Sequence, residues 1–343
     1  MPSFASSALR LLRKLLTSRG DSQGPYAGTR TVLDGNTAVA VTEAGISEAA
    51  GLGATYPADG ADLAWRAQQQ RLTENMIGRT LTSHTADSPR GALATALGLS
   101  LSGVRATAFL SSTDLASAQD LLAGAAGRHL PLVVHLGNRA LAGHANATGS
   151  GHEALHISAD SGCFTLFAAN VQEAVDFTLI ARRVAEQTLV PGLVVMDGPQ
   201  TALAMQDVAL PGHELVARYL GDPDDSIETP TAAQKLLFGD QRRRIPRWYD
   251  PDRPVLLGGV QTDASGGVGK AADGPFFAQQ LNAELGQAFK AFAQLTGREH
   301  RRVSTHRLDD ADLVLVAQGA AIETAEAVCE QLRSAHKRKV GVL

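Results

Sequence analysis

The sequence predicts an α/β protein built on a parallel sheet and followed by a partial second α/β domain. From Thr31 onward, short apolar runs alternate with longer stretches rich in small residues, which is the pattern of strands and crossover helices. Proline, aspartate and arginine interrupt this alternation over 210–254, as in a linker. We therefore expect an N-terminal arm at 1–30, a sheet domain at 31–210, a linker at 211–254 and a partial domain at 255–343.

The apolar and small-residue runs predict the elements in order. In the first domain we expect helices at 36–52, 91–103, 116–127 and 171–187, and strands at 54–56, 105–111, 132–136 and 192–196. In the second we expect a strand at 255–260, a helix at 276–295, a strand at 313–316, a helix at 323–336 and a strand at 340–343. The strands are apolar enough for a sheet covered on both faces. The last three elements form a β-α-β unit too small to stand alone, so another polypeptide should complete it.

Composition limits the classes of function. A formal net charge of -4, from 31 basic and 35 acidic residues, gives no overall reason to bind nucleic acid or an anionic membrane. The two cysteines, Cys163 and Cys329, have no CxxC spacing and cannot supply the four thiolates of an iron-sulfur cluster or a zinc site. We expect no metal on this chain and a cytoplasmic location, which such scarcity of cysteine suits.

The arm at 1–30 begins with leucines interleaved with arginine and lysine over 10–19, which predicts a short basic amphipathic helix. The apolar run is too short and too charged to cross a bilayer. Three roles stay open for it: a packing arm or frayed tail, a helix that docks on a partner, and a contact with a membrane surface.

Short motifs recur along the chain in the order of one family. They are L-D-G-N-T-A at 33–38, Y-P at 56–57, R-A-L-A-G-H at 139–144, G-H-E at 151–153, V-Q-E-A-V-D at 171–176, D-G at 197–198 with Thr201, Y-D-P at 249–251, L-T-G-R at 295–298, and Gly319 with E-T at 323–324. This series resembles the pyruvate:ferredoxin oxidoreductases, a 2-oxoacid:acceptor oxidoreductase family, in their alpha-subunit-like part.

The resemblance implies a thiamine-diphosphate pyrimidine-binding fold followed by the start of a transketolase-C-terminal-like domain. It allows thiamine diphosphate to bind at an interface with a partner subunit. It also implies a hetero-oligomer whose other chains carry the diphosphate-binding domain, the magnesium ion and the iron-sulfur clusters. In this chemistry a carboxylate beside the pyrimidine ring activates the cofactor.

The resemblance also implies a set of site residues, in which one position is lost. The family's activating glutamate aligns with Pro89, and proline has neither a carboxylate nor an amide proton. Asp87 is the acid that could substitute through a shifted loop. The other residues carried over are Tyr56, Pro57, Ser111 and Ser112 around the cofactor, and Arg139, Asp59 and Thr201 around the substrate, with Arg139 also a catalytic candidate.

Two of these positions have opposite consequences for a 2-oxoacid. Asp59 stands where the family has a substrate-binding threonine, and an anion there would repel the substrate carboxylate. Arg139 is retained, and a guanidinium is a suitable bidentate partner for that carboxylate. It could equally be structural and tie a strand end to the following loop.

Other motifs have plainer explanations beside functional ones. His144 and His152 lie among small and polar residues, so loop hydrogen bonding is favoured over metal binding. The run at 264–271 approaches a phosphate-binding loop but ends in alanine, and 272–275 should not continue a helix. The run Arg242–Arg244 could grip an acidic partner or form a solvated linker.

Two functions remain in balance. The first is a divergent or structural subunit of a 2-oxoacid:ferredoxin oxidoreductase-like complex, in which Pro89 and Asp59 have removed the usual chemistry. The second is an active alpha-type subunit that catalyses oxidative decarboxylation of a 2-oxoacid to an acyl-coenzyme A, with electrons passed to clusters on partner chains. A dinucleotide-binding protein is disfavoured because no strand is followed by G-x-G-x-x-G.

Overall fold

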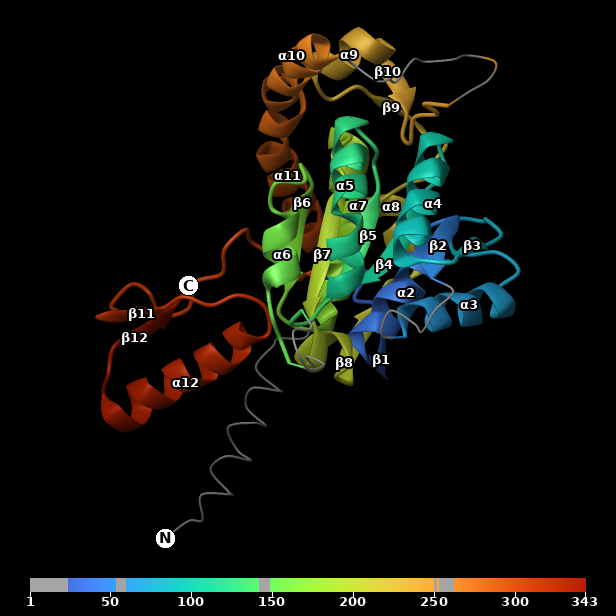
Figure 1. The fold of residues 1–343 in the computed structure, drawn as a ribbon. Coiled ribbons are helices and arrows are strands. Elements are labelled where there is room, and N and C mark those ends of the chain that lie inside the picture. The colour runs from blue at the N-terminus through green and yellow to red at the C-terminus, as the bar shows by residue number, and fades with distance from the viewer. Residues whose placement is uncertain (1–23, 54–59, 142–148, 250–251, 253–261) are drawn as a thin grey trace.

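A six-stranded parallel sheet is the centre of the molecule (Figure 1). The computed structural model describes residues 24–53, 60–141, 149–249, 252 and 262–343. The strand order is β3-β2-β4-β5-β7-β6, and every neighbouring pair runs parallel. The predicted α/β class and parallel sheet are therefore confirmed.

The sheet strands are β2 (Ala49–Gly53), β3 (Thr82–Ala86), β4 (Ala106–Ser111), β5 (Val133–Asn138), β6 (Phe164–Ala168) and β7 (Gly192–Asp197). The helices around them are α2 (Gly35–Ile46), α3 (Ala61–Arg71), α4 (Pro89–Leu101), α5 (Ser112–Gly127), α6 (Glu153–Ser158), α7 (Val171–Thr188) and α8 (His213–Tyr219). A separate antiparallel pair joins β1 (Thr29–Leu33) to β8 (Gln206–Leu210).

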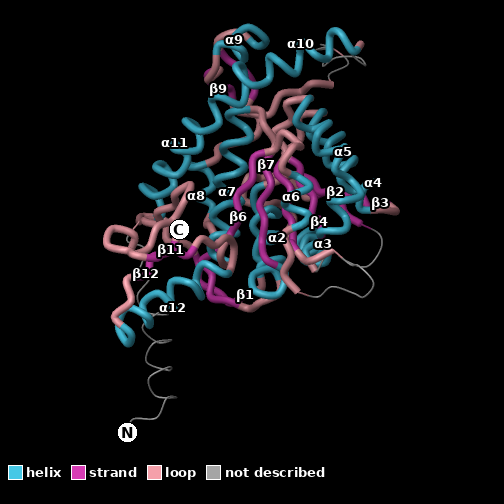
Figure 2. Tube along the Cα trace, turned by 60° about the vertical axis from the view of Figure 1, so that its left-hand side comes forward, coloured by secondary structure: helices cyan, strands magenta, loops and turns pink. Residues whose placement is uncertain are grey.

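Helices cover both faces of the sheet, as Figure 2 shows from a second side. On one face α4, α5 and α6 pack in sequence over a core that includes Leu110, Leu136 and Val195. On the other, α2, α3 and α7 enclose a core that includes Trp65 and Ile180. The central strands β2, β4, β5 and β7 are buried from both sides, which explains why their sequences do not alternate between apolar and polar residues.

The helix predicted at 36–52 is wrong in its second half. The α2 helix ends at Ile46, and Ser47, in extended conformation, caps it by donating its backbone N–H to Glu43 O. Residues Ala49–Gly53 then form β2 in the middle of the sheet. A five-residue run of alanine, glycine and leucine has no period that separates strand from helix. The strand predicted at 54–56 lies outside the described residues.

Four further strands of this domain were not foreseen. Strand β3 is polar and mostly exposed at one edge of the sheet, β6 alternates buried and exposed residues at the other edge, and β1 and β8 pair with each other. The remaining predicted helices and strands of 91–196 are confirmed, with boundaries shifted by a few residues.

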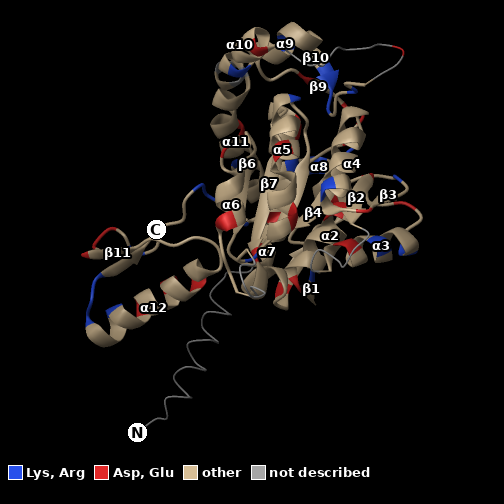
Figure 3. Cartoon of the chain, viewed as in Figure 1, with Lys and Arg blue, Asp and Glu red and all other residues tan. Residues whose placement is uncertain are grey.

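The stretch predicted as a linker carries ordered elements beyond α8. They are β9 (Ser226–Glu228), α9 (Ala232–Phe238) and β10 (Gln241–Arg243), with β9 and β10 paired antiparallel. In Figure 3 the blue of Lys and Arg marks part of this segment near β9 and β10. The prediction of a solvated basic run is wrong for Arg242, which is buried and donates from Nη2 to Glu186 O at 2.6 Å. Arg244 pairs with Asp225 at 3.3 Å.

The phosphate-loop-like run is helical instead of forming a loop. Helix α10 (Asp263–Asp273) passes through a π-helical turn at Gly274–Ala278 into α11 (Gln279–Thr296). The expectation that 272–275 would stop a helix is therefore wrong. The strand predicted at 255–260 lies outside the described residues.

Helix α11 lies along α7, and an ion pair joins two of the sequence motifs. Asp176 is fully buried and accepts from Arg298 Nε at 2.7 Å and from Nη2 at 2.8 Å. His300 Nε2 lies 2.9 Å from the same carboxylate. Burial would raise the pKa of Asp176, but the contacts with His300 and Arg298 lower it overall. The motifs V-Q-E-A-V-D and L-T-G-R thus hold the two helices together.

The chain's last described elements form the predicted β-α-β unit. Strand β11 (Leu313–Leu315), helix α12 (Ala321–His336) and strand β12 (Val340–Val342) stand beside the main body in Figure 1, with β11 parallel to β12. Leu313 and Val316 remain 59% and 77% exposed. Large apolar side chains at this small sheet are therefore left open to solvent.

Two groups of ion-paired side chains are buried inside the protein, between the sheet and the helices that pack on it. The Glu43 carboxylate of α2 accepts two hydrogen bonds from Arg182 Nη2, at 2.8 and 2.9 Å, and also contacts His135 Nε2 at 2.9 Å and Ser47 Oγ. All four side chains are at least 98% buried. Charges placed so deeply are stable only when paired, so this group joins α2 to α7 and β5.

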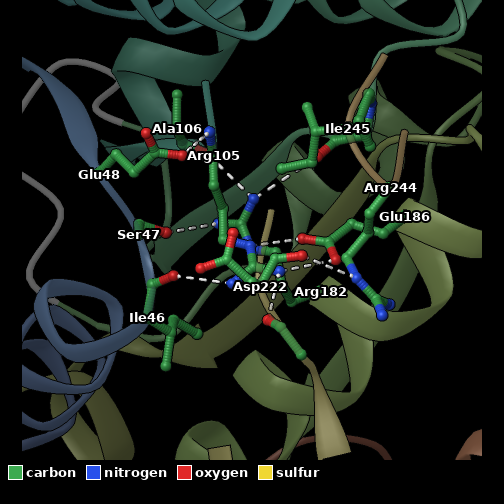
Figure 4. A network of polar contacts seen from close by, with 12 residues as sticks. Ile46, Ser47, Glu48, Arg105, Ala106, Arg182, Glu186, Asp222, Arg244 and Ile245 are labelled. Carbon is green, nitrogen blue, oxygen red and sulfur yellow. Dashed lines mark hydrogen bonds and ion pairs between the residues drawn. The ribbon is translucent and has the colours of Figure 1, made fainter. Parts of the chain in front are cut away.

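The second buried group joins the sheet to α7 and to the segment after α8. Figure 4 shows Arg105 facing Glu186, and both side chains are 0% exposed. Arg105 Nε and Nη2 lie 2.6 and 2.9 Å from the two carboxylate oxygens. Arg105 Nη1 also donates to Ile46 O at 3.1 Å, and Nη2 donates to Gly221 O at 3.3 Å. This bidentate pair is a structural centre and not part of an open site.

Candidate functional site

The candidate site lies along the carboxyl edge of the sheet. In register, β2 ends at Gly53 opposite Ala86 of β3, and β5 ends at Asn138 opposite Asp197 of β7, while Ser111 ends β4 beside Gly137. Ligands of open α/β sheets bind outside the carboxyl ends of the strands. The residues that follow these ends are therefore the first candidates for function.

Ser111, Ser112 and Arg139 meet at the ends of β4 and β5. The backbone N–H of Arg139 donates to Ser112 Oγ at 2.7 Å, and Ser112 Oγ donates to Asn138 Oδ1 at 3.3 Å. The backbone N–H of Ser111 donates to Asp114 Oδ2 at 2.8 Å at the start of α5. Both serines are buried, so their hydroxyls form the wall of this edge instead of projecting from it.

The Arg139 side chain passes over the D-G motif. A Cβ atom added at Gly198 would lie 2.4 Å from Arg139 Cγ, so only glycine leaves room for the stem of the arginine. The arginine is partly exposed at the end of β5. The sequence could identify both residues from motifs, but the structure adds the reason that they occur together.

The loop before α4 holds Asp87 and Pro89, the two positions that the resemblance relates to the family's activating acid. Ser88 caps the helix by accepting from Gly91 N at 3.1 Å, and Pro89 occupies the first helical position, where a proline is well tolerated. Asp87 is exposed. Its carboxylate is therefore open to solvent.

The other predicted site residues are only partly covered by the structure. Thr201 is fully buried in a π-helical turn after β7, and its Oγ1 lies 3.5 Å from Ala169 O. Its hydroxyl thus faces the protein interior. Tyr56, Pro57 and Asp59 lie outside the described residues, as does His144.

Three motifs distant in sequence meet at Asp197. Its Oδ1 lies 3.0 Å from His152 Nε2, and its Oδ2 accepts from Ala320 N at 2.8 Å. Gln318 Nε2 lies 2.9 Å from His152 Nδ1. The hydrogen-bonding role expected for His152 is confirmed. The segment that leads into α12 is anchored to the sheet through this cluster.

A substitution at Gly319 should loosen that anchor. Gly319 has a φ of +65°, and a Cβ atom there would lie 2.3 Å from Asp197 Oδ2. We expect Gly319→Ala to weaken local closure by about 1–3 kcal/mol and to speed amide hydrogen exchange in α12. Hydrogen exchange read by mass spectrometry tests this expectation.

The matched control is Gly286→Ala in α11, where an added Cβ meets nothing within 4 Å and helix propensity improves. It should leave exchange in α12 unchanged. Equal exchange in α12 for Gly319→Ala and the unaltered chain would show that the Asp197 cluster does not hold the segment.

An acid that the sequence did not single out lies at the same edge. Asp62, in the first turn of α3, is 4% exposed and accepts from Gly53 N at 3.0 Å through Oδ2. Its Oδ1 has no hydrogen-bond partner within the described chain. Burial raises the pKa of Asp62 to about 6, since the Gly53 N–H and Arg66 offset desolvation only in part and Asp114 adds a like charge.

Asp62 was missed because helix α3 itself was not predicted. The signal available was Asp62 two residues after Gly60 and ahead of the largely polar run 66–71, which marks a helix start but not a buried acid. No group of three or more His, Cys, Asp or Glu side chains in the described ranges is arranged to hold a metal ion. None of the helices in those ranges is both long and apolar enough to span a bilayer.

A parallel sheet of this order, with helices on both faces and polar groups along its carboxyl edge, is the pyrimidine-binding fold of thiamine-diphosphate enzymes. Residues 67–270 match the family described as pyruvate flavodoxin/ferredoxin oxidoreductase, thiamine diphosphate-binding. The chain belongs to this family, and the resemblance seen in its motifs is confirmed.

Similar proteins from bacteria and archaea belong to the same class of oxidoreductase. The chain is 30% identical over 315 residues to the probable pyruvate-flavodoxin oxidoreductase of Escherichia coli K12, covering 91% of this chain and 25% of that protein. It is 28% identical over 259 residues to pyruvate synthase subunit PorA of Methanothermobacter thermautotrophicus, covering 75% of this chain and 62% of PorA. It therefore spans less than two thirds of either relative.

One solved structure shows the same fold. The 2-oxoglutarate:ferredoxin oxidoreductase from Magnetococcus marinus aligns with a TM-score of 0.64 at 17% identity, over 92% of this chain and 53% of that one. At this identity the match establishes the arrangement of the backbone and leaves the chemistry to the residues of the site.

Proposed function

We propose that this chain is the pyrimidine-side subunit of a 2-oxoacid oxidoreductase complex whose active site has diverged. The observation that carries the proposal is the start of α4, where Pro89 replaces the expected glutamate while Asp87 is exposed. The usual acid is therefore absent from its usual place. The family membership supports the oxidoreductase class.

The carboxyl edge still suits an aminopyrimidine. Such a ring needs hydrogen-bonding groups in a desolvated wall, and Asp62 Oδ1 is a buried polar atom without a partner in the described residues. Ser111 and Ser112 form the adjoining wall at the ends of the strands. When bound, thiamine diphosphate supplies a carbanion-stabilising centre, and this chain would orient its pyrimidine half and exclude water.

The partners follow from what the chain lacks. The two cysteines of the sequence cannot hold an iron-sulfur cluster, so the clusters, the diphosphate-binding domain and its magnesium ion would lie outside this segment, as on partner subunits. The exposed apolar residues of β11, Leu313 and Val314, support a contact with another polypeptide at that edge.

A second candidate is an active alpha-type subunit that works with partner chains on a 2-oxoacid. Arg139 favours it, because this partly exposed residue directly follows the end of β5, at the edge of the sheet where α/β proteins bind ligands, and arginine is a suitable partner for a carboxylate. Asp59, outside the described residues, argues against it through charge repulsion. A purely structural subunit is the remaining alternative.

The test is the cofactor content of the complex isolated with its native partners. We expect thiamine diphosphate to bind in the presence of Mg²⁺, with a Kd for Asp87→Ala that stays within about twofold of the unaltered complex, as for most exposed sites. Isothermal titration calorimetry measures both. Loss of the cofactor on Asp87→Ala would make Asp87 the acid, and no binding to the unaltered complex would favour the structural subunit.

A further inference from the structure

We propose that the Asp62 carboxyl, through its Oδ1 atom, is the hydrogen-bonding partner of the aminopyrimidine ring, in place of the glutamate missing at position 89. This inference rests on the proposed function, because it requires thiamine diphosphate at the carboxyl edge. The Asp62 carboxyl would then be the group that moves a proton at a site without its usual acid.

The position of Asp62 follows from the strand register. Its Oδ2 accepts from the backbone N–H of Gly53 at 3.0 Å, and Gly53 pairs directly with Ala86. Ala86 is the last residue before the loop that leads to Pro89. Neighbouring strands lie about 4.8 Å apart. Asp62 therefore lies at the carboxyl end of β2, one strand away from the β3 end that leads to position 89.

Neighbouring side chains fix the orientation of this carboxyl. Arg66, one turn later on α3, donates from Nη2 to Gly53 O at 3.2 Å and from Nη1 to Thr85 Oγ1 at 2.9 Å. The arginine therefore ties α3 to the ends of β2 and β3. With Oδ2 engaged by Gly53, Oδ1 is the buried oxygen of Asp62 that has no hydrogen-bond partner among the described residues.

A buried oxygen without a partner needs an explanation, because such atoms are rare in folded proteins and costly. A role limited to closing the turn after β2 would use Oδ2 alone and leave Oδ1 unexplained. A ring nitrogen of an aminopyrimidine can accept a hydrogen bond from a protonated carboxyl or share its proton. The orphan atom thus points to a ligand of that chemistry.

The charges that face Asp62 suit proton exchange near neutral pH. Arg66 is the positive group beside it and Asp114, at the start of α5, is the negative one. Burial sets the pKa of Asp62 near 6 despite the arginine, and general acids work best when their pKa lies near the working pH.

The experiment compares Asp62→Asn with Asp87→Asn in the complex with its native partners, using thiamine diphosphate with Mg²⁺ as the probe. Asparagine keeps the acceptor for Gly53 N but cannot exchange a carboxyl proton. The measurements are the Kd by calorimetry and the rate at which the thiazolium C2 proton exchanges in D₂O, read by acid quench and proton NMR.

We expect Asp62→Asn to slow C2 proton exchange by about 100-fold or more, the usual contribution of a positioned acid or base, while Asp87→Asn matches the unaltered complex. If the Asp62→Asn complex binds the cofactor and exchanges its C2 proton at the unaltered rate, the proposed role of Asp62 is overturned. The proposed function of the chain would not be affected by that result. An unaltered complex that binds no cofactor would overturn the proposed function, and the inference would fall with it.

A second variant keeps the test decisive if Asp62→Asn fails to fold. Asp114→Asn retains an acceptor for the Ser111 N–H but removes the like charge that faces Asp62. The pKa of Asp62 should then fall, and the pH midpoint of C2 exchange should move to lower pH. A purely structural role for Asp62 would leave that midpoint where it was, which would contradict the proposal.

Discussion

Replacement of Arg105 by alanine is expected to lower the free energy of unfolding by about 3–5 kcal/mol, the usual cost of removing one partner of a buried ion pair. The Glu186 carboxylate would stay 0% exposed without its bidentate partner. The backbone carbonyls of Ile46 and Gly221 would lose their donor as well. Equilibrium unfolding in urea, followed by circular dichroism, measures the change.

The matched control replaces both charges with apolar groups of similar size, Arg105→Met together with Glu186→Leu. Because neither charge of this pair is then left without the other, the double variant should recover part of the lost stability. The carbonyls of Ile46 and Gly221 still lack their donor, and the buried Arg242 loses the nearby charge of Glu186. A single variant Arg105→Ala that unfolds at the same urea concentration as the unaltered chain would show that Arg105 and Glu186 do not stabilise the fold.

The framework of the fold could be predicted because parallel strands that are buried on both faces appear in the sequence as short apolar runs. Strand β7 and helix α7 differ in length and in polar content, so both were recognisable. The run Ala49–Gly53 was not, since a short alanine and glycine run fits either state. The polar edge strand β3 is extended because it pairs with β2. The local sequence of β3 does not indicate this pairing.

The candidate site also contains some residues that sequence motifs point to and others that only the fold reveals. Motifs identified Arg139 and Asp197 because their neighbours in sequence resemble a family. Asp62 carries no motif, and its interest comes from burial and an unpartnered oxygen, which exist only after α3 has folded against β2. Likewise, the sequence showed the arginine run near Arg242 as a charged segment, although the fold buries Arg242 against α7.

Acid should destabilise the protein through Glu43. Burial would raise the pKa of this carboxyl, but the charge of Arg182 and the contacts with His135 and Ser47 lower it to about 2. Because the folded value lies below the value of 4.5 for a free glutamate, the stabilisation is complete above about pH 4.5. It is lost as the pH falls toward 2.

The shift corresponds to about 3 kcal/mol, at about 1.4 kcal/mol for each pKa unit. Glu43→Gln should therefore be less stable than the unaltered chain at pH 7, and the difference between them should close between about pH 4.5 and 2. Urea unfolding midpoints at a series of pH values test this, with Asp87→Asn as the exposed control whose difference should stay near zero.

A constant difference across that pH range would mean that Glu43 is not ionised in the folded protein. The consequence would extend beyond one residue, because His135 and Arg182 are oriented by the same carboxylate. A neutral Glu43 would leave the guanidinium of Arg182 buried without a counter-charge, which folded proteins avoid. The pH dependence of stability therefore tests whether the charge of this group fixes the packing of α2 and α7 against β5.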